Sequence, residues 1–147
     1  MIIGVSGAGS CSKSEYDEAY EIGRLIAKSG AMLVTGGLYG VMEAASHGAK
    51  DAGGTTIGVL PGSRKEDANK YIDIPIVTDA SHMRNVIIAN TADVMIAVYG
   101  SFGTLSEIAL ALKIGKKVIG YNTWDIKDVV TAESPEDAVK KAIKYAG

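Results

Sequence analysis

Cysteine is nearly absent from this sequence, since Cys11 is the only one among 147 residues. One cysteine excludes an internal disulfide framework and a cysteine-based zinc site, and it fits the reducing cytoplasm in which we expect the protein to be located. No spacing of His, Asp or Glu resembles a metal site either. We therefore expect no bound metal and no required cofactor.

A dominant charge is also missing. The 15 Lys and Arg residues nearly balance the 17 Asp and Glu residues, which leaves a formal net charge of −2. This gives no electrostatic reason to expect nucleic acid or an anionic membrane surface as a partner, and a small molecule is favoured. No stretch approaches the roughly 20 apolar residues of a membrane-spanning helix. The short apolar start at 1–6 is typical of a buried strand rather than of a signal peptide.

What the sequence does contain is a repeated unit: a short apolar run, a glycine turn and then a helical pattern. The runs are Ile2 to Ser6, Ala31 to Thr35, Thr55 to Leu60, Asp93 to Val98 and Lys117 to Gly120. Strands buried on both faces and separated by helices indicate a parallel sheet with right-handed crossovers. We predict a single α/β domain over residues 1–147, Rossmann-like and doubly wound. Its mostly parallel sheet has the strand order 3-2-1-4-5, with helices on both faces.

Three segments depart from this repeat. Residues 63–70 are rich in charge and poor in apolar side chains, which predicts a mobile loop. Residues 72–77 contain Pro75, which cannot donate to a strand ladder, so an edge strand or an irregular segment is expected there. Residues 121–133 fit no element and stay unassigned.

Glycine-rich turns follow the predicted strands. In a parallel sheet the turns at 7–10, 36–40, 61–62 and 99–104 all lie at the carboxyl edge and face one crevice. Glycine lets a backbone approach a phosphate closely, and a purely structural role is the alternative. The spacing matches neither G-x-G-x-x-G nor G-x-x-x-x-G-K-[ST]. The candidate ligand-binding residues are Gly7, Gly9, Ser10, Gly36, Gly37, Gly40, Gly100, Ser101, Phe102, Gly103 and Thr104.

Glu107 has two competing interpretations. Residues 104–107 read Thr-Leu-Ser-Glu, a well-formed capping box in which a helix begins at Thr104 and the Glu107 side chain returns to the Thr104 N–H. The other interpretation is a catalytic carboxylate in the crevice. The two roles compete, because a carboxylate held by backbone N–H groups is less free to reach a substrate.

Arg84 is the second candidate for chemistry. It lies near the start of a helix over about 80–91, where the helix dipole disfavours a cation, so an anionic partner beyond the helix is expected. A surface arginine is the alternative. His82 could enter the crevice beside it, whereas His47 is expected on the outer face of its helix. The same helix carries four other side chains on one face: Met83, Val86, Ile87 and Asn90.

Taken together, these residues resemble a known family. Residues 36–42, Arg84 and residues 99–107 are similar to the GGxxGxM, arginine and PGGxGTxxE motifs of the LOG-like (Lonely Guy) proteins, in the same order and spacing. The resemblance runs from Ile2 to about Gly120. Two positions depart from the motif, because Tyr99 replaces its proline and Ser101 replaces its second glycine.

The resemblance implies a function. Characterised LOG-like enzymes cleave the N-glycosidic bond of a nucleoside 5′-monophosphate, so Gly100 to Thr104 would hold the phosphate. Arg84 would bind the substrate and Glu107 would act at the ribose, both as catalytic residues. With these two departures, the sequence resembles a sub-branch of the family that includes molybdenum-cofactor carrier proteins. Those proteins bind a phosphorylated pterin without catalysis.

Three hypotheses follow from the sequence. The first is a nucleotide-binding phosphoribohydrolase, and the second is a non-catalytic carrier or sensor of a phosphorylated ligand such as the molybdenum cofactor. The third is an interaction scaffold with an empty crevice. The resemblance also implies a bound nucleotide or pterin and a homo-oligomer, either a dimer or a tetramer.

Overall fold

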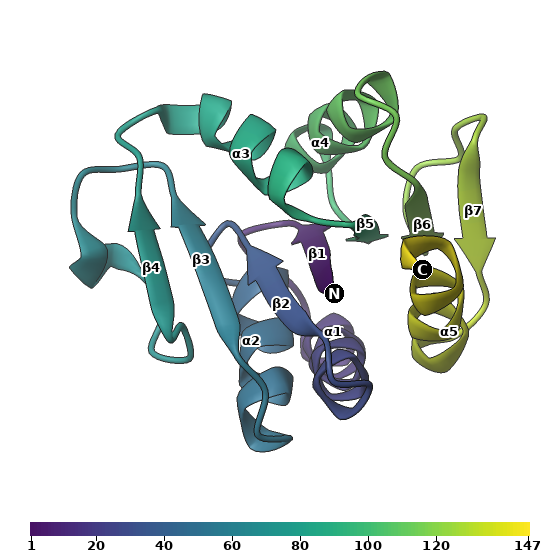
Figure 1. Cartoon of the computed structure of the whole chain (residues 1–147), viewed down its shortest axis with the longest axis horizontal. Helices are drawn as coiled ribbons and strands as arrows, with labels where there is room; N and C mark the ends of the chain where they lie inside the picture. Colours follow the sequence, from purple (N-terminus) through teal and green to yellow (C-terminus); the bar gives the residue numbers. More distant parts are fainter.

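Seven parallel strands form the centre of the protein, as seen in a computed structural model that describes residues 1–147 (Figure 1). Their order is β4-β3-β2-β1-β5-β6-β7, and all six neighbouring pairs are parallel. The strands are β1 (Ile2–Gly7), β2 (Met32–Thr35), β3 (Thr56–Leu60), β4 (Ile74–Val77), β5 (Val94–Val98), β6 (Val118–Tyr121) and β7 (Val129–Ala132). The predicted Rossmann-like class is thereby confirmed.

The sheet is wider than the sequence indicated. The five predicted strands lie side by side in the predicted order, as β3-β2-β1-β5-β6. Residues 72–77 supply the edge strand β4, with Pro75 opposite Gly58. The unassigned residues 121–133 supply β7 at the other edge, in register with β6 through Val118 and Val129.

Helices cover both faces of the sheet (Figure 1). On one face lie α1 (Lys13–Lys28), α2 (Val41–Asp51) and α5 (Pro135–Ala146), and on the other lie α3 (Arg84–Thr91) and α4 (Phe102–Lys113). Short 3-10 turns occupy Lys65–Asp67 and Ser81–Met83. No helix combines the length and the apolar character needed to span a bilayer.

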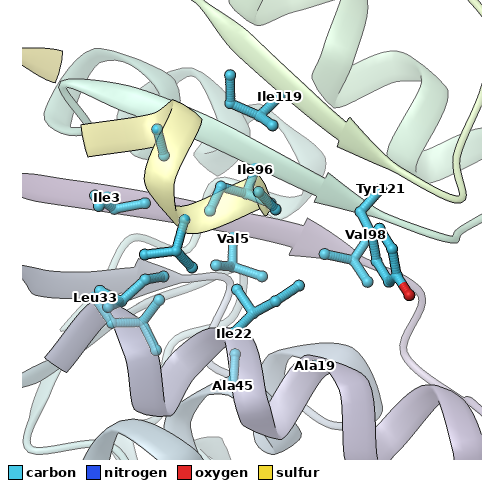
Figure 2. Close-up of a cluster of buried hydrophobic side chains, with 14 of the residues drawn as sticks. Ile3, Val5, Ala19, Ile22, Leu33, Ala45, Ile96, Val98, Ile119 and Tyr121 are labelled. Atoms are coloured by element: carbon cyan, nitrogen blue, oxygen red, sulfur yellow. The ribbon is translucent and has the colours of Figure 1, made fainter. Parts of the chain in front are cut away.

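The core is split into two layers by the sheet. Val94, Ile96 and Val98 of β5 belong to a cluster of 20 buried residues under α1, α2 and α5 (Figure 2). Met95 and Ala97 belong to a second cluster of 11 residues under α3 and α4. Because successive side chains of a strand point to opposite faces, a strand covered on both sides needs the unbroken apolar run seen here.

The charged loop at 63–70 is held near its carboxyl end by hydrogen bonds of Asn69. Asn69 is buried, and its side-chain amide donates hydrogen bonds to the carbonyl oxygens of Gly37 at 3.3 Å and Leu38 at 2.6 Å. The Asn69 backbone N–H also donates to Gly37 O at 2.9 Å. The loop is therefore fastened to the second glycine turn.

Helix α3 exposes much of its apolar surface. It buries Arg84, Ile88 and Ala89. The face that carries Val86 and Ile87 points to solvent, together with Met83 just before the helix. The helix therefore buries a charged side chain, Arg84, while it leaves several apolar side chains exposed.

Candidate functional site

A cavity of about 420 Å³ opens at the carboxyl edge of the sheet. It lies where the chain order reverses, between the turn after β1 and the start of α4 after β5. The candidate residues that line it are Gly7, Gly9, Ser10, Arg84, Ser101, Gly103, Thr104 and Glu107. Ala8, Met42, His82 and Asn85 complete the wall. The fold therefore brings the first turn, the fourth-strand turn, Arg84 and Glu107 to one place.

Three candidate glycines lie behind this cavity rather than along it. A Cβ on Gly36 would stand 2.7 Å from Arg84 Nη2, so the guanidinium rests against bare backbone there. Gly40 has a φ of +63° and packs against the first turn, with a Cβ position 2.4 Å from Ala8 O. Gly37 has a φ of +75° and faces Leu60. The second glycine turn therefore packs against residues of the cavity wall without lining the cavity itself.

Two candidates in the fourth-strand turn also lie off the cavity wall. Gly100 has a φ of +92°, and a Cβ there would clash with Thr104, so the glycine is needed for the turn itself. Phe102 is 78% exposed, and its ring lies 6.0 Å from that of Trp124. Neither lines the cavity.

The predicted capping box at Thr104 is wrong. Helix α4 begins at Phe102, with Ser101 as N-cap and no side-chain cap bond, so Thr104 is already inside the helix. The helix begins three residues earlier than the pattern indicated, because Ser101 rather than Thr104 is the N-cap. The first N–H groups of a helix have no intrahelical partner, and here no side chain takes them. They remain available to an anion.

The Glu107 carboxylate instead faces the crevice. It accepts a hydrogen bond from the hydroxyl group of Ser6, the penultimate residue of β1. Burial raises the pKa of Glu107, while the Ser6 hydrogen bond and the charges of Arg84 and His82 oppose that rise. Ser6 was not among the site residues predicted from the sequence. The available signal was a hydroxyl side chain near the carboxyl end of an otherwise apolar buried strand.

Arg84 is buried in the same wall, with only 7% of its surface exposed. Its Nη1 donates to Asn85 Oδ1 at 2.6 Å. Burial lowers the pKa of Arg84, and the nearby Glu107 charge acts in the opposite direction. A cation this deeply buried with one hydrogen bond is poorly compensated, because desolvation disfavours the charged form.

Two buried polar atoms in the cavity wall have no hydrogen-bond partner in the protein. They are Arg84 Nε and Thr104 Oγ1. Buried polar groups in native proteins are nearly always hydrogen-bonded. Both atoms belong to residues that line the cavity, a donor on Arg84 and a hydroxyl group on Thr104, so both are exceptions to this rule.

Replacing Glu107 by Gln should stabilise the free protein at neutral pH. Because the folded-state pKa lies above the ordinary value of 4.5, the native state binds more protons than the unfolded chain in the window between the two pKa values. The free energy of unfolding therefore falls as the pH rises through that window. Glutamine keeps an acceptor for Ser6 without the charge. The advantage should disappear below the ordinary glutamate pKa.

Urea denaturation of Glu107→Gln across a pH series measures this effect. The exposed Glu66, for which the structure gives no hydrogen bond or ion pair, provides the control variant Glu66→Gln. Equal stability of Glu107→Gln and wild type at every pH would contradict the prediction.

Comparison with known proteins places this chain in a family. Residues 1–146 match the SLOG cluster4 family. The structure resembles the molybdenum cofactor binding protein of Rippkaea orientalis with a TM-score of 0.93 and 40% identity, covering 99% of this chain and 97% of that one. It also resembles the molybdenum cofactor carrier protein of Chlamydomonas reinhardtii, with a TM-score of 0.89, 38% identity, and coverage of 98% and 96%.

A further relative is an enzyme. The sequence is 33% identical over 123 residues to the cytokinin riboside 5′-monophosphate phosphoribohydrolase LOG of Oryza sativa subsp. japonica. The match covers 78% of this chain and 51% of the enzyme, so the chain spans about half of that relative's length. The family match, the LOG relative and the carrier structures agree. The chain therefore belongs to the SLOG cluster4 family among the LOG-like proteins, on a branch that resembles the molybdenum cofactor carriers.

Proposed function

We propose that the cavity binds a small phosphorylated ligand. The observation that carries this proposal is the pair of buried, unpartnered polar atoms, Arg84 Nε and Thr104 Oγ1, on two residues that line the cavity. A phosphate group has acceptor oxygens for both. The uncapped start of α4 supplies backbone N–H groups at the same place. The cavity volume is within the range of small-molecule sites.

The ligand that we propose is the molybdenum cofactor, held for transport or storage without reaction. The similarity to a cofactor binding protein and a cofactor carrier over nearly the whole of both chains supports this choice. The turn after β5, where this chain departs from the motif of the LOG-like enzymes, supports this choice as well. Tyr99 has a φ of +50°, which a proline cannot adopt because its ring fixes φ near −65°. This turn therefore has a different backbone from one built on the proline of the PGGxGTxxE motif.

Removing the Arg84 side chain should weaken ligand binding at least about tenfold, because hydrogen bonds to charged groups are among the strongest in proteins. Arg84→Ala can be compared with Arg64→Ala, which changes an exposed arginine remote from the cavity wall. Isothermal titration with inorganic phosphate, nucleoside 5′-monophosphates and the isolated cofactor measures the affinities. In thermal unfolding, a ligand at 100 times its Kd should add about 2.7 kcal/mol to the stability of wild type. Wild type that responds to none of these probes would refute the proposal.

A second candidate function is hydrolysis of a nucleoside 5′-monophosphate, which the position of Glu107 favours. In that reaction, water adds across the N-glycosidic bond and yields the free base and ribose 5-phosphate. The carbon that loses the base gains positive charge in the transition state, and a buried carboxylate facing it is stabilising. Ser6 would hold that carboxylate in place.

Hydrolysis is tested by the release of free base from a panel of nucleoside monophosphates. If wild type releases base, Glu107→Gln should lower kcat at least about a hundredfold, a loss typical of a positioned carboxyl group. Its affinity for inorganic phosphate should be retained. Binding of monophosphates by wild type without release of base would exclude the enzyme and leave the carrier.

We also propose that the protein forms a homo-oligomer through the exposed face of α3. Met83 is 74% exposed, and Val86 and Ile87 are exposed beside it. The strand register pairs the exposed Ile74 and Ile76 of β4 with the β3 residues that pack under α3, so these two side chains lie on the same face of the sheet as α3. Contiguous exposed apolar patches mark interaction sites in soluble proteins.

Light scattering coupled to size-exclusion chromatography measures the oligomeric state. A charge placed in the centre of this face, as in Met83→Glu combined with Ile87→Glu, should shift the protein to monomers, because the charge would be buried unpaired in an interface. Met32→Glu, at the similarly exposed amino end of β2, is the control. A wild type that is monomeric at high micromolar concentration would refute the proposal.

A further inference from the structure

The turn that begins α4 is built on an unusual backbone. Tyr99 has a φ of +50° and Gly100 a φ of +92°, so two consecutive residues lie in the left-handed region. Glycine adopts this conformation freely, whereas a tyrosine does not. A residue other than glycine keeps this backbone conformation only where the surrounding structure holds it there. Tyr99 therefore needs an anchor.

The structure shows such an anchor at both ends of the residue. The Tyr99 N–H donates to Tyr121 O at 3.1 Å, and its carbonyl oxygen accepts from Thr123 Oγ1 at 2.6 Å. Its hydroxyl group donates to the Glu18 carboxylate of α1. Asn122 Nδ2 donates to the same hydroxyl oxygen at 3.2 Å. Backbone and side chain are thus held by two segments, residues 121–123 and helix α1.

The phenol is suited to act as a permanent donor. Burial and the Glu18 carboxylate both raise the pKa of Tyr99. The neighbouring Tyr121, whose ring lies 6.0 Å away edge to face, has a pKa raised to about 12 by burial and by Glu18. Both hydroxyl groups therefore stay protonated at neutral pH.

The turn that Tyr99 anchors leads directly into the cavity. Ser101 and Gly103 line it, and the carbonyl oxygen of Ser101 is tied to Trp124 Nε1 at 3.0 Å. Neither Tyr99 nor Glu18 lines the cavity. Any influence they have on a ligand must pass through the backbone of the turn.

We propose that Tyr99 and Glu18 are positioning residues that hold the start of α4 in the conformation that binds an anion. This inference rests on the proposed ligand-binding function. Where the related motif has a proline, whose ring restricts the backbone, this chain uses a tyrosine in a left-handed conformation. The restriction comes from a hydrogen bond across to α1. The hydrogen bond thereby links a helix on one face of the sheet to the ligand site at its edge.

The test compares variants that remove the hydroxyl–carboxylate bond with variants that keep it. Tyr99→Phe and Glu18→Ala remove the bond, whereas Glu18→Gln keeps an acceptor for the phenol and should restore binding. Tyr145→Phe is the matched control, since Tyr145 is an exposed tyrosine on α5 for which the structure gives no hydroxyl hydrogen bond. Melting temperatures show whether each variant folds.

Two readouts are measured. The Kd for inorganic phosphate should rise about tenfold in Tyr99→Phe and Glu18→Ala, the loss expected for one charge-assisted hydrogen bond. It should stay near the wild-type value in Glu18→Gln and Tyr145→Phe. Trp124 is the only tryptophan and is bonded to the turn, so its fluorescence should change in Tyr99→Phe and stay unchanged in Tyr145→Phe.

Phosphate affinity and Trp124 emission that are both unchanged in Tyr99→Phe would overturn the inference. A wild type that binds no phosphorylated probe refutes the proposed function instead. In that case amide exchange at residues 100–104 decides the inference: faster exchange in Tyr99→Phe than in wild type supports it, and equal exchange overturns it.

Discussion

The structure depends on the parallel pairing of β1 with β2 on one side and β5 on the other. Because all strands run in the same direction, every strand-to-helix turn leaves the sheet at one edge, and the chain diverges there to opposite faces. The divergence opens the cavity between Gly7 and the start of α4. Arg84 enters it from α3 and Glu107 from α4. The residues of the site come from distant parts of the chain, and the sheet brings them together.

Much of the fold could be predicted from the sequence because burial on both faces leaves a strong pattern. The run Val94 to Val98 is apolar at every position, since its alternate side chains enter two separate cores. Strand β7 leaves no such pattern, because an edge strand is covered less completely and Val129 and Val130 are only partly buried. The edge strand β4 was foreseen through Pro75 alone.

The site was harder to predict, and Glu107 shows why. Its sequence neighbours form a capping box, which is a local pattern, whereas its actual partner Ser6 lies 101 positions away. Gly100 adopts a left-handed conformation just before α4, and the helix begins early enough to place Glu107 beyond its first turn. Arg84 was expected to meet an anion because of its position on its helix. Its burial against Gly36 is a tertiary contact that no local pattern contains.

The unpaired atoms of the cavity wall also bear on the lifetime of the protein in a cell. Arg84 and Glu107 are buried ionisable groups whose charged forms the burial disfavours, so keeping them costs the folded chain part of its stability. A ligand that binds only the folded chain adds its binding free energy to that stability. Proteases act on the unfolded fraction, so abundance would follow the supply of ligand, with empty molecules degraded first. A site whose polar groups are completed only by a ligand would thus make the amount of protein follow the amount of ligand.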